Sequence, residues 1–179
     1  YENERLFATL SKKGDNYEPV KLDDAAYGNI RADTLTLPGG RIGIGINVDD
    51  HMDGSDNTIA FYTTKLFMDD SLQTEVTLDD IGYDVTRYIN AYSDYKTRQI
   101  NHKWVQCLFQ LPGNRLDGIY THLNATKGWL NPGDTGTHKI SIVITDDRGN
   151  QSTIRFYITC HSGSTPPRTY GGELGTPFF

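Results

Sequence analysis

The chain has 179 residues with 17 basic and 23 acidic side chains, so its formal net charge is −6 at pH 7. This length suits a single domain, and 11 tyrosines with seven phenylalanines are more than a disordered chain would carry. The acidic balance without a basic cluster argues against a nucleic-acid partner, and no apolar run is long enough for a membrane span. Because the chain starts with Tyr1 and has no charged leader with an apolar core, we expect a processed or truncated piece of a larger protein.

Residues alternate between apolar and small or polar along much of the chain, which predicts β-strands. Weak alternation over residues 6–10 and 34–37 is followed by a faultless pattern over residues 41–48. There, one set of side chains would face a core and the other would face away. The inward set is Ile42, Ile44, Ile46 and Val48, and the outward set is Gly43, Gly45 and Asn47.

Five further segments have the same period, at residues 60–68, 72–78, 104–111, 139–145 and 153–160. Within 104–111 we expect one inward face made of Val105, Cys107, Phe109 and Leu111. The last two segments flank the turn sequence Asp-Asp-Arg-Gly-Asn at residues 146–150. This order predicts an antiparallel hairpin with a five-residue loop.

One segment, residues 84–95, offers a helical alternative, because Tyr88, Ala91, Tyr92 and Tyr95 recur at helical spacing. We expect its tyrosines to pack on the neighbouring strands. Short strands separated by turn sequences predict an all-β fold, an immunoglobulin-like antiparallel β-sandwich with at most one short helix. The predicted organisation is an N-terminal extension or first strands (1–34), the sandwich (35–160) and a Gly/Pro-rich tail (161–179).

The glycine face at Gly43 and Gly45 is unusual, because glycine weakens a strand and leaves its surface bare. Two interpretations remain open. Aromatic side chains of an adjacent strand cover the face, or the face is a docking surface for another chain. Trp104, Trp129 and exposed tyrosines are candidates for stacking on sugar rings. The candidate binding residues are therefore Gly43, Gly45 and Trp104.

The loop at residues 49–57 is the densest run of oxygen ligands in the chain. Calcium prefers carboxylate and carbonyl oxygens, so one hypothesis is a calcium site at Asp49, Asp53 and Asp56. The alternative is an ordinary acidic turn, since the spacing is not that of an EF-hand. The five histidines, at positions 51, 102, 122, 138 and 161, have no zinc-ligand spacing, and we expect them to be solvated or hydrogen-bonded.

Two cysteines, Cys107 and Cys160, both fall on predicted inward faces. They either form one disulfide between the sheets or remain buried free thiols that pack as small apolar groups. The triplets that begin at Asn124 and Asn150 match the N-glycosylation pattern, which matters only in a secreted eukaryotic protein.

Four segments of the chain resemble a known protein family. They are residues 39–46 (GGRIGIGI), 50–57 (DHMDGSDN), 86–91 (TRYINA) and 111–116 (LPGNRL). The first two are similar to a GKIGIGI…DRMDGSNN stretch in the non-catalytic region that follows the peptidase domain of exported bacterial lysostaphin-type zinc endopeptidases. The resemblance covers residues 35–160, and His51 stands where the family pattern has Arg.

The resemblance implies a non-catalytic accessory domain, because the zinc-binding H-x-x-x-D and H-x-H motifs of the family are missing from this sequence. We expect no cofactor in this chain, with zinc only in the peptidase domain of the parent protein. That domain is the expected partner, together with peptidoglycan or an envelope protein, and the expected location is the periplasm or cell envelope. The alternative is a stand-alone module that binds glycan or protein outside the cytoplasm.

Overall fold

The structure is a computed structural model, and it describes most of residues 34–161 together with three short N-terminal strands. The described residues are 8–13, 16–22, 29–31, 34–38, 40–48, 50–51, 58–59, 61–79, 81–95, 98–99, 102, 104–133 and 135–161. Of the predicted tail at 161–179, His161 is described and ends a strand, while residues 162–179 lie outside the described residues. Asp49, Asp53 and Asp56 of the predicted calcium loop lie outside them as well.

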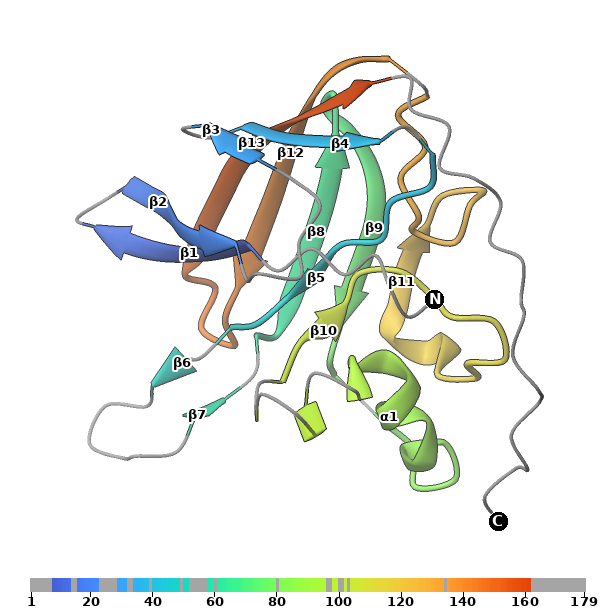
Figure 1. Cartoon of the computed structure of the whole chain (residues 1–179). Coiled ribbons are helices and arrows are strands. Elements are labelled where there is room, and N and C mark those ends of the chain that lie inside the picture. The colour runs from blue at the N-terminus through green and yellow to red at the C-terminus, as the bar shows by residue number, and fades with distance from the viewer. Residues whose placement is uncertain are drawn as a thin grey trace.

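A seven-stranded sheet forms the larger layer of the fold (Figure 1). Its strand order is β11-β9-β8-β12-β13-β4-β3. The strands are β3 (Asn29–Arg31), β4 (Thr34–Pro38), β8 (Thr63–Met68), β9 (Ser71–Thr77), β11 (Tyr120–Leu123), β12 (Gly136–Thr145) and β13 (Gln151–His161).

Neighbouring strands of this sheet are antiparallel in every pair but one, because β4 runs parallel to β13. The all-β prediction is confirmed, but the expected purely antiparallel arrangement is wrong at this pair. A parallel pair is possible here because β4 and β13 are far apart in the chain, so no tight hairpin forces them to run antiparallel.

The hairpin of β12 and β13 is confirmed, with the predicted loop at residues 146–150. Ten residue pairs run in unbroken register from Gly136–Cys160 to Thr145–Gln151. Asp146 closes the loop, because its carboxylate accepts hydrogen bonds from the backbone N–H groups of Arg148 and Asn150 at 2.9 and 2.8 Å. Such an Asx turn lets a polar side chain replace the missing ladder bonds.

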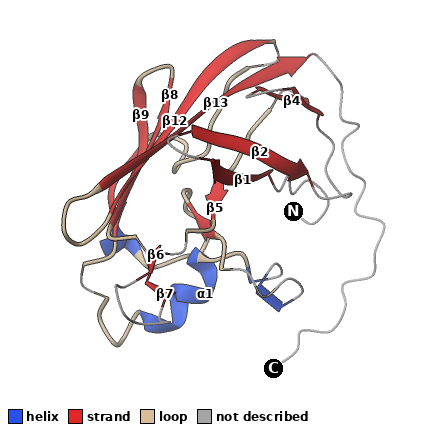
Figure 2. Ribbon diagram, turned by 90° about the vertical axis from the view of Figure 1, so that its left-hand side faces the viewer, coloured by secondary structure: helices blue, strands red, loops and turns tan. Residues whose placement is uncertain are grey.

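The second layer is smaller and less regular, and it faces the concave side of the sheet (Figure 2). Its strands are β5 (Gly45–Ile46) and β10 (Gln106–Cys107), and single bridges join Ile42 to Leu130 and Ser93 to Gln106. The predicted strand at 41–48 is thus regular over two residues only. Its facing pattern is nevertheless confirmed, since Ile46 is buried, Ile42 and Ile44 are half-buried, and both glycines are exposed.

The core lies between these two layers. From the sheet it receives Leu66, Val76, Ile140, Ile142 and Ile158, and from the second layer Ile46, Tyr92, Leu108, Leu116 and Leu130. All ten side chains are at most 8% exposed. Burial of this apolar surface is the main favourable contribution to folding.

The segment at 104–111 departs from its prediction. The buried residues at even positions are Gln106, Leu108 and Gln110, whereas Val105 and Phe109 are only half-buried and lie against the glycines of the neighbouring strand. The predicted inward face is therefore wrong for Val105, Phe109 and Leu111. Cys107 is buried as predicted, but Leu108 packs into the core, which turns Phe109 to the opposite side.

The helical segment is shorter than its periodicity suggests. It consists of the 3-10 turn η1 (Thr86–Tyr88) and the one-turn helix α1 (Ile89–Tyr92). Tyr92 is buried and Tyr88 packs against the core, as expected, but Tyr95 is 53% exposed and does not pack there.

Both cysteines, Cys107 and Cys160, are buried thiols, so the disulfide alternative is not realised. The remaining elements are two antiparallel pairs and a 3-10 turn: β1 (Ala8–Lys13) with β2 (Asn16–Leu22), β6 (Asp50–His51) with β7 (Thr58–Ile59), and η2 (Asp117–Ile119). Because β3 pairs with β4, part of the predicted N-terminal extension belongs to the main sheet.

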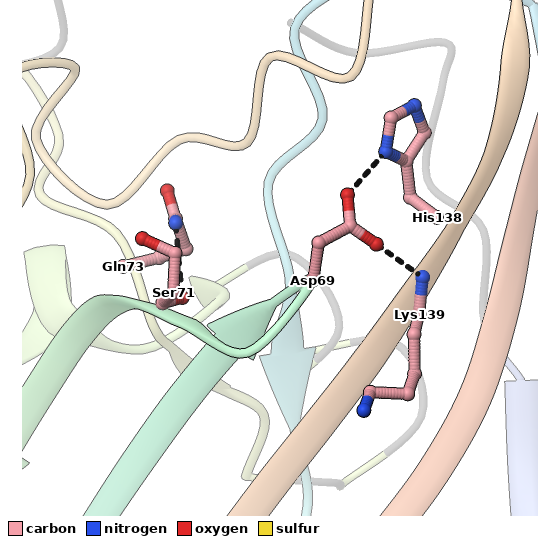
Figure 3. A network of polar contacts seen from close by, with 5 residues as sticks. All are labelled: Asp69, Ser71, Gln73, His138 and Lys139. Atoms are coloured by element: carbon pink, nitrogen blue, oxygen red, sulfur yellow. Dashed lines mark hydrogen bonds and ion pairs between the residues drawn. The ribbon is translucent and has the colours of Figure 1, made fainter.

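A two-residue turn joins β8 to β9, and both of its residues, Asp69 and Asp70, have positive φ angles of 49° and 63°. Such turns usually contain Asn or Gly, because few side chains tolerate this conformation. Here β12 fastens the turn (Figure 3). Nδ1 of His138 lies 2.6 Å from Oδ2 of Asp69, and the backbone N–H of Lys139 donates to Oδ1 at 2.9 Å. A carboxylate only accepts, so His138 is the donor.

The contacts of the turn affect its ionisation. The hydrogen bond from His138, followed by that from the Lys139 backbone, lowers the pKa of the Asp69 carboxyl below its ordinary value. The other ring nitrogen of His138, Nε2, is buried and has no hydrogen-bond partner among the described residues. The pair therefore fastens the turn, and the second ring nitrogen of His138 is shielded from solvent.

Replacing Asp69 with Asn should remove part of the pH dependence of stability. The ionised carboxylate is favoured in the folded state, so its contribution is present above the ordinary carboxyl pKa of about 3.9 and is lost as the pH falls through the lowered pKa. We expect the wild-type protein to be more stable than D69N at neutral pH and the difference to shrink towards about pH 2.5. Thermal unfolding across this range measures it. Asp147→Asn, in the exposed 146–150 loop, is the control, and a difference that stays constant with pH would contradict the assignment.

Candidate functional site

A surface pocket of about 320 Å³ lies where three chain segments meet. Arg41 precedes the second-layer strand, residues 110–117 form one wall, and Lys127 and Trp129 come from the loop after β11. The complete lining is Arg41, Gln110, Leu111, Pro112, Gly113, Asn114, Asp117, Lys127 and Trp129. A concave site that combines an aromatic ring with several polar groups has the general make-up of a small-ligand site.

The aromatic wall of the pocket is built over Gly43. A Cβ atom added at Gly43 would lie 2.6 Å from a ring carbon of Phe109 and 2.8 Å from one of Trp129. These two rings contact each other at 4.1 Å between centroids, with an interplanar angle of 44°. The guanidinium of Arg41 lies over the Trp129 ring, 5.2 Å from its centroid. Of the two interpretations of the glycine face, coverage by aromatic side chains is the one found at Gly43.

The loop that carries Trp129 is organised by the side chain of Asn124. Its Oδ1 accepts from the backbone N–H of Thr126 (3.1 Å), the Thr126 hydroxyl (3.0 Å) and the backbone N–H of Gly128 (2.8 Å). Its Nδ2 donates to Oε1 of Gln73 at 2.7 Å and to the backbone oxygen of Trp129 at 3.2 Å. The amide of this glycosylation-like triplet is thus part of the loop's internal framework.

A tight backbone approach at Gly128 completes the loop. Lys127 and Gly128 have positive φ angles of 60° and 81°. A Cβ at Gly128 would lie 2.5 Å from Oγ1 of Thr74 and 2.6 Å from the backbone oxygen of Leu108. Only glycine allows the loop to lie this close to the strand backbone.

The opposite wall is a polar network that begins at Gln110. Its Nε2 donates to Oδ1 of Asp117 at 2.5 Å and to the backbone oxygen of Asn114 at 3.3 Å. Oδ1 of Asn114 in turn accepts from the backbone N–H of Leu116 at 2.9 Å. Behind this wall, the hydroxyl of Tyr120 donates to the backbone oxygen of Phe109, and burial raises the pKa of the Tyr120 phenol. The tyrosine therefore stays a neutral donor.

The acidic side chain of the pocket has a hydrogen-bond partner, whereas its two basic side chains form no ion pair among the described residues. Asp117 accepts the hydrogen bond from Gln110, whereas no ion pair involving Arg41 or Lys127 is found among the residues that the structure describes. Two cations and one carboxylate line the pocket of a chain whose formal net charge is −6. The site is therefore locally cationic.

The binding residues predicted from sequence are not brought together in one site. Gly43 supports the aromatic wall, but Gly45 faces Val105, whose Cγ1 would lie 2.7 Å from an added Cβ. Trp104 does not line the pocket, and its ring lies under the guanidinium of Arg98 at 4.1 Å. Arg41, Lys127 and Asp117 were missed, since nothing in their sequence spacing indicates that they meet.

The histidines show no common site. Among the described residues, no group of three or more His, Cys, Asp or Glu side chains is placed to hold a metal ion. His102, His122 and His161 are exposed, while His138 contacts Asp69.

Among the residues that the structure describes, no helix has the length and apolar character needed to span a bilayer.

Comparison of the chain with protein-family models, with curated proteins and with solved structures found no match.

Replacing Asn124 with Ala should destabilise the protein by roughly 2–3 kcal/mol, because five hydrogen bonds of the loop are lost. The near-UV circular dichroism of the aromatic wall should weaken as well, since Trp129 loses its support. Urea unfolding measures the first effect. Asn90→Ala, on an exposed position of α1, provides the same chemical change and should stay within about 0.5 kcal/mol of wild type. Equal effects of the two substitutions would contradict the role of Asn124.

A second test compares two glycines with nearly the same conformation. Gly128 and Gly113 have φ angles of 81° and 80°, but nothing lies within 4 Å of a Cβ added at Gly113. Gly113→Ala should cost about 1–3 kcal/mol for the strained backbone alone. Gly128→Ala should cost more, because the new methyl group also overlaps the Leu108 backbone. Calorimetric unfolding of both variants gives the difference, and equal losses would show that the close approach is unimportant.

Proposed function

We propose that this chain is a non-catalytic accessory domain of an exported zinc endopeptidase that cleaves peptidoglycan, and that it positions the catalytic domain on this polymer. The proposed architecture is an immunoglobulin-like sandwich, and the proposed location is the periplasm or cell envelope. Zinc belongs to the peptidase domain of the parent protein. The four segments that resemble the family support this proposal.

One structural observation carries the proposal furthest. Two of the four segments, 39–46 and 111–116, are distant in the chain but meet at one pocket. The first contributes Arg41 to the lining, and the second contributes Leu111, Pro112, Gly113 and Asn114. The first segment also supplies Gly43, on which the Trp129 ring depends. This convergence favours the pocket as the contact site of the accessory domain.

A second candidate is a stand-alone module that binds glycan or protein outside the cytoplasm. The observation that favours it is the composition of the pocket, where the Trp129 ring lies near the amides of Gln110 and Asn114. An aromatic face with amide groups around it suits the apolar and hydroxyl faces of a sugar ring. This candidate needs no peptidase domain.

The test starts from the complete reading frame that contains this chain. We expect it to encode H-x-x-x-D and H-x-H motifs, and we expect the purified whole protein to release soluble fragments from peptidoglycan sacculi. Trp129→Ala should lower release from sacculi several-fold while leaving cleavage of a short soluble peptide unchanged, because the small substrate needs only the catalytic domain.

Trp104→Ala is the matched control, since Trp104 lies outside the pocket. If it lowers release as much as Trp129→Ala does, the pocket is not the contact site. A reading frame without the zinc motifs would contradict the accessory role and favour the stand-alone module.

A further inference from the structure

The pocket has two features that together select a chemical class of ligand. It is lined by two basic side chains with no ion pair among the described residues, and it offers an aromatic ring beside them. We propose that the pocket binds the free carboxylate of a short peptide, with Arg41 and Lys127 as its charged partners and Trp129 as the surface for the adjoining apolar group.

Arg41 is suited to carboxylate binding by its position. A guanidinium that lies over an aromatic ring is attracted by the negative face of the ring. The in-plane N–H donors of a stacked guanidinium still serve other partners, and they match the two oxygens of a carboxylate. Arg41 is exposed, so its hydrogen-bonding edge is accessible to a ligand.

Lys127 provides the second charge from a fixed place. Its backbone is held with a φ angle of 60°, its N–H donates to the backbone oxygen of Asn124, and its carbonyl oxygen accepts from Gln110. The backbone of Lys127 is therefore fixed at the rim, and its exposed side chain extends from this place. Asp117, the one carboxylate of the lining, is oriented by the hydrogen bond from Gln110.

The volume of the pocket matches a small chemical group. A volume of about 320 Å³ is at the lower end of the range for small-molecule sites, so it suits a dipeptide-sized group. The proposed function supplies the source, because peptidoglycan consists of glycan strands with short peptides that end in carboxylates. That the ligand carries a carboxylate is inferred from the pocket alone. That this carboxylate belongs to a peptide of peptidoglycan rests on the proposed function.

The experiment uses the 179-residue chain and a defined probe, N-acetyl-D-alanyl-D-alanine, titrated by calorimetry and by tryptophan fluorescence. We expect binding that weakens with added salt, since charges are screened. The C-terminal amide of the same dipeptide should bind roughly tenfold more weakly or worse, because a charge-assisted contact is lost. Arg41→Gln and Lys127→Gln should each give a loss of similar size while keeping the wild-type melting temperature.

Arg148→Gln is the matched control, because Arg148 is exposed in the 146–150 loop and does not line the pocket. It should bind the probe like wild type. Equal affinity for the acid and the amide, equal losses for Arg148→Gln and Arg41→Gln, or no binding of the dipeptide would each overturn the proposal. Binding of N-acetylmuramic acid in place of the dipeptide would also overturn it, because the carboxylate would then come from a sugar. None of these outcomes depends on a peptidase domain, so the two proposals fail separately.

Discussion

The absence of a side chain at Gly43 is the constraint on which the second layer and its pocket depend. Phe109 and Trp129 have ring carbons 2.6 and 2.8 Å from the place where a Cβ would be. Any side chain larger than hydrogen would displace both rings, and with them the support for the Arg41 guanidinium. On the opposite side of the same strand, the isoleucines face the core. One short segment thus joins the core of the protein to its surface site.

Period-two alternation predicted the larger layer well, because in a sheet with one buried face the pattern reports burial directly. The hairpin of β12 and β13 is the clearest case. Its isoleucines at 140 and 142 are at most 2% exposed, and its loop begins and ends where the turn residues indicated. Strand β4 also has its predicted place in the sequence. Its parallel pairing with β13 could not be predicted, since alternation says nothing about which strand lies beside another.

The segment at 104–111 shows where alternation fails. Its two faces both carry apolar side chains, so hydrophobicity alone does not choose between them. The glutamines at 106 and 110 suggest an exposed face, but both are buried at 2% and 8% exposure. For Gln110, burial is tolerated because its amide donates to Asp117 and to the Asn114 backbone. A polar side chain that has hydrogen-bond partners inside the protein can lie on the buried face of a strand, where the sequence pattern predicts an apolar one. Such partners are known only from the three-dimensional structure.

The pocket could not be predicted for a related reason, because its lining comes from three separate segments of the chain. In addition, the loop that carries Trp129 is supported by Asn124, and the triplet that begins at Asn124 suggests a glycosylation site instead. Its electrostatics are equally local. A net charge of −6 repels anions at long range, but at physiological ionic strength charges more than about 8 Å apart are largely screened. Arg41 and Lys127 therefore decide how strongly an anion is held once it enters, while the net charge lowers the rate at which it arrives. An anionic ligand of this pocket would thus owe its affinity to close contacts and not to electrostatic attraction from a distance.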